Sequence, residues 1–268
     1  MKLINNFLVG SDVEFFLVDK QTGKPVSAEG LVKGSKDEPY FFDESNPYFA
    51  TSLDNVSYEG NIPPAKTADE FVAYMKKLRD YMDSSVPNTL KTLAKGSVRM
   101  DWKYLETEIA QLYGCHPSQN AWSGETELVE ANPKSNLRAA GFHIHIGYDK
   151  PDYDRNIEII KAMDSYLGVP AVLLEPADER KKVGYGRAGN HRHTRYGVEY
   201  RSLSSYFASS DELIRWCFNQ TTKAIDFINN GRIKEIEGLG DEIQFVINNN
   251  SKRRAKKLVD QFEIELPQ

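Results

Sequence analysis

The segment at 142–147, with the sequence FHIHIG, constrains the fold of this chain more than any other. Its apolar residues alternate with His143 and His145. Successive side chains of a strand point to opposite faces, so both histidines lie on one face and the apolar residues pack on a core. Two imidazoles side by side on a strand are typical of a divalent-metal site, or of a hydrogen-bonded pair at a sheet edge. The segment alone favours neither reading.

Three further segments carry ionisable residues among apolar neighbours, as strands with one polar face would. These are 7–18 with Asp12 and Glu14, 56–60 with Glu59, and 198–203 with Glu199 and Arg201. Several such residues on one sheet would be costly without a counter-charge, so the pattern predicts a metal or a cationic ligand there. Carboxylates with some imidazole suit Mg²⁺ or Mn²⁺, usually shared with phosphate oxygens.

A run of arginines precedes Glu199 and favours phosphate as the ligand: Arg180, Arg187, Arg192 and Arg195. Guanidinium groups bind phosphate and stabilise the charge that develops in phosphoryl transfer. A solvated basic loop that pairs with surface acids is the alternative. The GYGRAG segment at 184–189 formally matches a dinucleotide-binding motif, but no strand–helix unit surrounds it, so we do not expect a Rossmann domain.

The remaining pattern predicts one α+β domain over residues 1–268, with a curved, mostly antiparallel sheet and helices on one face. A capping box formed by Thr67 and Glu70 begins a helix over 67–83. Apolar periodicity predicts further helices at 152–167, 210–229, 240–248 and 251–262, and a second helix after Pro87 within 84–96. We expect the segment 178–196 to be a loop.

Composition excludes some classes of function. The net charge of −5 gives no electrostatic reason to expect a nucleic-acid partner. No apolar run is long enough to span a bilayer, and the first residues are too polar for a signal peptide, so we expect a cytoplasmic protein. Cys115 and Cys217 are expected to be reduced. Cys115 is followed by His116, but adjacent residues do not readily bring a thiolate and an imidazole together, which favours a structural role.

The order of these motifs resembles a known family. Gly10–Phe15, then Glu59, then Gly141–Gly147, then Gly197–Arg201 follow the order found in carboxylate–amine ligases of the glutamine synthetase and glutamate–cysteine ligase fold. The chain is most similar to the phage-encoded COOH-NH2 ligases of type 2, over residues 8–230. The resemblance implies a catalytic domain like that of glutamine synthetase, and a host-cytoplasm location if the protein is phage-encoded.

The resemblance also implies roles for single residues. Metal ligands would be Asp12, Glu14, Glu59, His143 and Glu199, while His145 would lie near the nucleotide. Arg187 and Arg192 would contact the nucleotide and stabilise phosphoryl transfer, and Arg201 would contact phosphate or substrate. The first motif reads Asp-Val-Glu where glutamine synthetase has Glu-x-Glu, which leaves the role of Asp12 open.

The activity that the resemblance implies is ATP-dependent amide formation with Mg²⁺ or Mn²⁺. A small-molecule or peptide carboxylate would become an acyl phosphate, which an amine then attacks. Neither nucleic acid nor membrane would be a partner, and an oligomer is compatible with the sequence. Three alternatives stay open: a guanidino- or amino-phosphotransferase of the same fold, a metal-dependent hydrolase that uses the two histidines, and a non-enzymatic protein that retains the fold.

Overall fold

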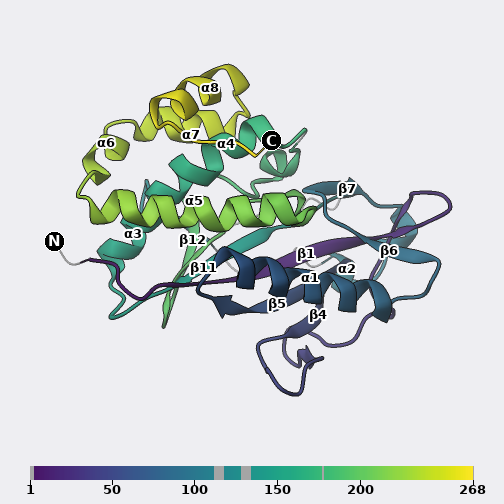
Figure 1. Ribbon diagram of the computed structural model, residues 1–268. Helices are drawn as coiled ribbons and strands as arrows, with labels where there is room; N and C mark the ends of the chain where they lie inside the picture. The colour runs from purple at the N-terminus through teal and green to yellow at the C-terminus, as the bar shows by residue number, and fades with distance from the viewer. Residues whose placement is uncertain (1–2, 112–117, 128–133, 177, 268) are drawn as a thin grey trace.

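The computed structural model describes residues 3–111, 118–127, 134–176 and 178–267. Its centre is the long strand β1, which runs through an eleven-stranded antiparallel sheet (Figure 1). The strands follow the order β3-β4-β5-β1-β11-β13-β12-β8-β9, and the short strands β2 and β6 pair with the second half of β1. A separate two-stranded sheet joins β7 and β10. The predicted antiparallel sheet is therefore confirmed.

The bounds of the elements are as follows. The strands are β1 Leu8–Asp19, β2 Pro25–Val26, β3 Tyr40–Phe41, β4 Ala50–Asp54, β5 Ser57–Ala65, β6 Leu90–Leu93, β7 Ser97–Arg99, β8 Ser118–Asn120, β9 Thr126–Glu127, β10 Leu137–Ala139, β11 Phe142–Gly147, β12 Asn190–Thr194 and β13 Gly197–Tyr200. The α-helices are α1 Ala68–Ser85, α2 Glu108–Gln111, α3 Tyr153–Met163, α4 Val169–Leu174, α5 Asp211–Asn229, α6 Ile233–Glu237, α7 Gly240–Asn248 and α8 Lys252–Gln261. A π-helical turn, Asp164–Gly168, joins α3 to α4, and short 3₁₀ turns lie at Trp102–Tyr104, Arg180–Val183 and Ser205–Ala208.

Helices α1, α3 and α5 lie against one face of the sheet, as the sequence predicts (Figure 1). Alternation along the strands supplies the apolar side of this contact, with Val13 and Phe15 from β1 and Ile144 from β11 all buried. Each such side chain contributes about 1.5–3 kcal/mol when it leaves water. The same alternation directs Asp12 and Glu14, and the two histidines of β11, to the opposite face of the sheet.

The predicted N-terminus of the first helix is confirmed. The Thr67 hydroxyl accepts a hydrogen bond from the Glu70 amide at 3.2 Å, and the Glu70 carboxylate accepts one from the Lys66 amide at 2.7 Å. These bonds satisfy donors that the first turn of a helix leaves unpaired.

A second, smaller apolar cluster covers the far end of the polar face. Phe16 follows Glu14 on that face and is fully buried against Val98, Met100 and Leu105. The two-stranded sheet of β7 and β10 supplies part of this cover. The polar surface of β1 is thus confined to the stretch that carries Asp12 and Glu14.

Two expectations about local structure are wrong. Residues 84–96 form no second helix, because Leu90–Leu93 pairs with β1 and buries Leu90 in the main core. The segment 178–196 is not all loop, because Asn190–Thr194 pairs with β13 and packs its histidines towards α3.

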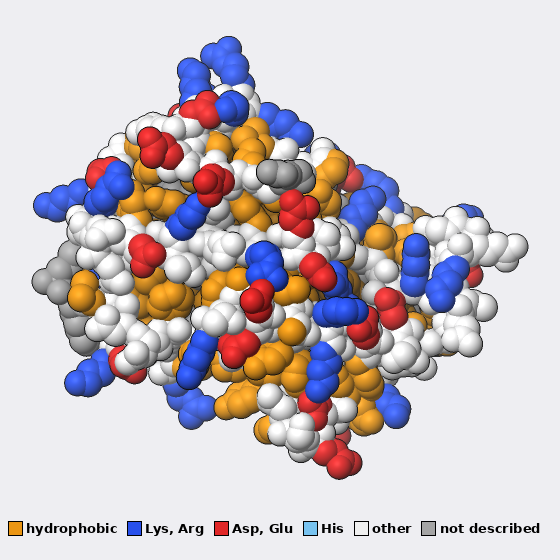
Figure 2. All heavy atoms as spheres, in the orientation of Figure 1, with side chains coloured by type: hydrophobic (Ala, Val, Ile, Leu, Met, Phe, Trp, Pro, Cys, Tyr) orange, Lys and Arg blue, Asp and Glu red, His pale blue; other side chains and the backbone are white. Residues whose placement is uncertain are grey.

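The surface seen from the helical side shows no single-sign patch. Figure 2 shows acidic and basic side chains interspersed over α1 and α5, with basic side chains projecting at the top of the view over α8. The predicted amphipathic character of α8 is confirmed, because Ala255, Leu258 and Val259 are buried and Arg253 is exposed. Within the described ranges, no helix has both the length and the apolar character needed to cross a bilayer.

Candidate metal and phosphate site

Strand register brings the predicted site residues onto one surface. Glu14 of β1 lies opposite Glu59 of β5, and Asp12 lies opposite His143 of β11. His145 lies opposite Glu199 of β13, which in turn lies opposite Arg192 of β12. Four neighbouring pairs of strands therefore place side chains from residues 12 to 199 in one continuous polar row.

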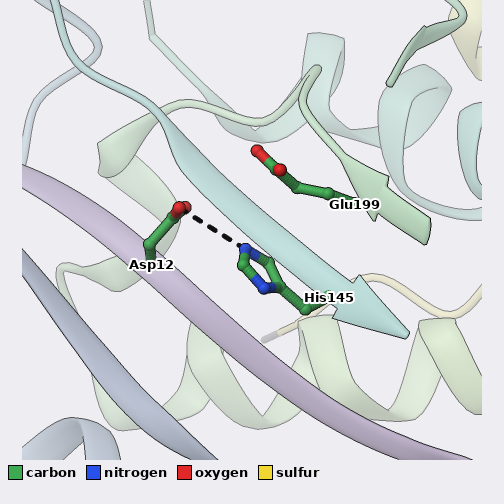
Figure 3. A group of neighbouring side chains, drawn as sticks. All are labelled: Asp12, His145 and Glu199. Carbon is green, nitrogen blue, oxygen red and sulfur yellow. Dashed lines mark ion pairs between the residues drawn. The ribbon is translucent and has the colours of Figure 1, made fainter. Parts of the chain in front are cut away.

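Asp12, His145 and Glu199 form the tightest group in this row. Their potential ligand atoms all lie within 4.8 Å of one another (Figure 3). The Nε2 atom of His145 is 3.4 Å from Oδ2 of Asp12. His143 adjoins the group, with Nδ1 2.7 Å from Oδ1 of Asp12 and 3.5 Å from Oε1 of Glu199. Three strands thus contribute one acid or imidazole each, and β11 contributes a second imidazole.

The donor set fits a divalent cation. Ligand atoms about 2.1 Å from one ion lie about 3.0–4.2 Å apart, so this group needs only a small contraction to hold one. Asp12 Oδ1 and His145 Nε2 are buried, and neither has a hydrogen-bond partner of good geometry among the described residues. Burial opposes ionisation of Asp12, but the imidazoles of His143 and His145 outweigh it and hold the pKa of Asp12 well below its usual range.

Two arginines flank Glu199 on the same surface. The guanidinium of Arg201 donates a hydrogen bond to Glu199 Oε1, and Arg192 Nη1 lies 3.4 Å from Oε2. Glu199 and Arg201 are both buried, whereas the side chain of Arg192 is 37% exposed. Arg192 is therefore accessible to an anionic ligand that approaches from solvent. Arg201 and Glu199, which are buried, form the floor of the site.

Glu14 and Glu59 form a second acidic pair beside this group. Glu14 accepts hydrogen bonds from the Gly141 amide at 2.8 Å and from the Tyr185 hydroxyl at 3.3 Å, while Ser52 donates to Glu59 at 3.3 Å. Burial and then the charge of Asp54 raise the pKa of Glu14, and burial and then Asp12 raise the pKa of Glu59 well above its usual range. Both carboxyl groups therefore lose their protons less readily than an exposed glutamate does.

The arginines of the segment 178–196 divide into two kinds. Arg180 is fully buried, pairs with Asp178 and donates to the carbonyls of Ser202 and Leu203, so the expectation that it joins the phosphate site is wrong. Arg187 is exposed, and its guanidinium has no acidic partner among the residues that the structure describes. Arg195 is also exposed, in the turn between β12 and β13.

The loop that carries Arg187 is held firmly. The Arg187 amide donates to Asn190 Oδ1 at 2.9 Å, and the Arg187 carbonyl accepts from the Ser202 hydroxyl at 2.7 Å. Gly186 has φ +68°, and the buried guanidinium of Arg180 lies 2.8 Å from the position that a Cβ would take there. The loop is therefore a fixed support for Arg187.

Several residues at or under the site escaped prediction. Tyr185 contacts Glu14, and Tyr196 contacts His145 with its hydroxyl 2.7 Å from Nδ1. Asp164, on the helical face, accepts from the Gly189 amide and from the hydroxyl of Tyr200. Each sits outside the strand alternation that revealed the others, so only the three-dimensional structure connects it. The hypothesis on Cys115 and His116 falls outside the described residues.

Comparison with known proteins points to ligases. The model of the family described as "Phage phiEco32-like COOH.NH2 ligase-type 2" matches residues 128–219. A bifunctional glutathione synthetase from Pasteurella multocida has a similar structure at a TM-score of 0.51 and 12% sequence identity, with 96% of this chain and 49% of that chain covered. This likeness shows the fold, and the present chain spans about half the length of that protein.

Two further results complete the comparison. Glutamine synthetase from Plasmodium falciparum aligns over 82% of this chain and 52% of its own, at 10% identity and a TM-score of 0.34, which is too low to establish a common fold. The chain has no match among curated protein sequences. The matched segment 128–219 contains both histidines of β11, the loop of Arg187 and Glu199, and its match confirms the resemblance of this chain to the COOH-NH2 ligases of type 2.

Proposed function

We propose that this protein is an ATP- and metal-dependent carboxylate–amine ligase that forms an amide bond through an acyl phosphate. The observation that supports this most strongly is the convergence of Asp12, His145 and Glu199 on one surface, with the accessible Arg192 beside Glu199. The loop before β12 carries a second exposed arginine, Arg187. Acidic and imidazole groups suit Mg²⁺ or Mn²⁺, and guanidinium groups suit phosphate oxygens. The family match to residues 128–219 supports the same class of reaction.

Each residue has a defined task in this proposal. Asp12, Glu199 and the two histidines would hold one cation, and Glu14 with Glu59 would hold another. When bound, such cations would offset the negative charge of the triphosphate. Arg187 and Arg192 would orient the γ-phosphate and stabilise its charge during transfer, since catalysis of phosphoryl transfer consists mostly of positioning and charge stabilisation. We propose that residues 1–268 act as one catalytic unit, because the sheet joins strands from both halves of the chain.

The proposed reaction has two steps. A carboxylate oxygen of the first substrate attacks the γ-phosphorus of ATP, and the bond to the β,γ-bridging oxygen breaks to leave ADP. The amine then attacks the carbonyl carbon of the acyl phosphate, loses a proton, and displaces inorganic phosphate. The buried floor that Arg201 and Glu199 form beneath the reacting groups would help to exclude water, which would otherwise hydrolyse the acyl phosphate.

Isotope transfer tests this sequence of steps. The protein, ATP and Mg²⁺ or Mn²⁺ are incubated with mixtures of amino acids, short peptides and polyamines, and mass spectrometry identifies any new amide. The active carboxylate is then supplied with ¹⁸O, and we expect one ¹⁸O atom to appear in each phosphate released. Phosphate that remains on the acceptor would replace the proposal with a phosphotransferase, and substrate cleavage without ATP would replace it with a hydrolase.

A further inference from the structure

Tyr196 lies in the tight turn between β12 and β13, directly above the polar row. Gly197 follows it with φ +152°, and a Cβ there would come within 2.0 Å of the Ile146 carbonyl oxygen. Only glycine tolerates this backbone and this approach, so the turn is fixed against β11. The fixed turn places the ring of Tyr196 alongside that of His145, with the centroids 6.1 Å apart and the planes 16° from parallel.

The two rings share a hydrogen bond that orients the histidine. The Tyr196 hydroxyl is 2.7 Å from His145 Nδ1. The other ring nitrogen, Nε2, is 3.4 Å from Asp12 Oδ2, and it has no hydrogen-bond partner of good geometry within the described part of the chain. Figure 3 shows His145 on β11 with its ring directed at Asp12. One nitrogen is thus held by a phenol, and the other faces the carboxylates.

Histidine ligands of metals are held in this way. A partner on the non-coordinating nitrogen fixes the tautomer and the ring orientation, and its loss typically costs about 10–100-fold in metal affinity. Tyr196 meets the requirement on three counts: its oxygen contacts the outer nitrogen, its ring lies beside the imidazole, and its turn cannot shift. Its hydroxyl contacts Nδ1 of His145, so it acts on the cation through His145.

We propose that Tyr196 is a positioning residue that aims Nε2 of His145 at a divalent cation shared with Asp12 and Glu199. The inference rests on the proposed function, since it requires a cation in that group. In the cation-bound state, Nδ1–H of His145 donates to the Tyr196 oxygen, which leaves the lone pair of Nε2 directed at the ion. The Tyr196 hydroxyl is the partner of Nδ1, so removal of the hydroxyl takes away the contact that orients the ring.

Direct titration with Mn²⁺ tests the proposal without reference to activity. Free Mn²⁺ is measured by electron paramagnetic resonance for wild type, Tyr196→Phe, His145→Gln and the double variant. We expect Tyr196→Phe to weaken Mn²⁺ binding about tenfold, and to have no further effect when His145 is already glutamine. Tyr196 is 46% exposed, so loss of its hydroxyl should leave the melting temperature unchanged.

Tyr153→Phe is the matched control. Tyr153 is also an exposed tyrosine stacked on a histidine, His193, with ring centroids 4.4 Å apart, but it lies on the helical side of the sheet. Its variant should bind Mn²⁺ as wild type does. Equal affinity of wild type and Tyr196→Phe, or an undiminished effect in the His145→Gln background, would overturn the inference and leave the proposed function standing. Failure of wild type to bind Mn²⁺ would overturn both.

Discussion

Arg180→Met should destabilise the protein strongly, although the residue lies in a segment that reads as a solvated basic loop. The guanidinium is 1% exposed and donates to Asp178 from two nitrogens, both at 3.0 Å. It also donates to the carbonyls of Ser202 and Leu203, just beyond the end of β13. Methionine fills a similar volume, so the change removes the charge and the donors and leaves little cavity.

The expected loss of stability follows from Asp178, which Arg180→Met leaves buried without its main partner. Burial opposes ionisation of Asp178, but Arg180 outweighs it, and the pKa of Asp178 falls from 3.8 to about 2. That difference corresponds to roughly 2–3 kcal/mol, and loss of one partner of a buried ion pair typically costs about 3–5 kcal/mol. Lys181 remains 3.4 Å from Asp178 and offsets part of the loss. We therefore expect Arg180→Met to lower the free energy of unfolding by about 3 kcal/mol.

Urea unfolding of wild type, Arg180→Met and the double variant Arg180→Met/Asp178→Asn measures this loss of stability. Arg180→Met should lower the midpoint with little change in slope. Arg180→Met combined with Asp178→Asn should recover at least half of the loss, because the buried carboxylate that had paired with Arg180 is then removed. A single variant within about 1 kcal/mol of wild type, or a double variant no more stable than the single one, would refute the reasoning.

Two further predictions concern the site loop and its support. Arg187→Met should lower kcat/KM for ATP by about 10³-fold, while its free energy of unfolding should stay within about 0.5 kcal/mol of the wild-type value. The control Arg253→Met, on α8, should change neither quantity. An Arg187→Met enzyme as active as wild type would count against a role of Arg187 in phosphoryl transfer. Burial raises the pKa of Asp164 to about 7, above the value of 3.8 that it has when unfolded, so its contribution to stability is complete below about pH 4 and is lost as the pH rises through 7. In urea unfolding, Asp164→Asn should therefore lose less free energy of unfolding than wild type between pH 4.5 and pH 8. Glu175, whose pKa is also raised to about 7, keeps some pH dependence in both proteins. Identical losses in the two proteins would contradict this prediction.

The sequence predicts the polar face of the sheet well, for a simple physical reason. A strand alternates with a period of two, so Asp12 and Glu14, or His143 and His145, must share a face wherever the strand lies. That pattern does not determine which strands are neighbours in the sheet. Only the register pairs His145 with Glu199 across β11 and β13, and it does so because the apolar residues of both strands must face the same helices.

Loops and buried polar contacts were beyond prediction. Arg180 and Arg187 are the same residue type seven positions apart, but one is buried on Asp178 and the other exposed, a difference that depends on the path of the backbone through Gly186. Residues 90–93 look like part of a helix, because only their pairing with β1 supplies the partner that makes them a strand. Tyr196 carries no signal in the sequence beyond its place before a glycine.

Substrate-stimulated phosphate release from ATP tests the central claim most directly. Wild type, Glu199→Gln and the surface control Glu235→Gln are compared with Mg²⁺ or Mn²⁺ and the carboxylate and amine mixtures. Because Glu199 joins the candidate cation group to Arg192 and Arg201, we expect release by wild type and the control, and about a 10³-fold slower release by Glu199→Gln. Equal release by Glu199→Gln and wild type, or none by wild type with any mixture, would contradict an ATP-driven ligase centred on this group.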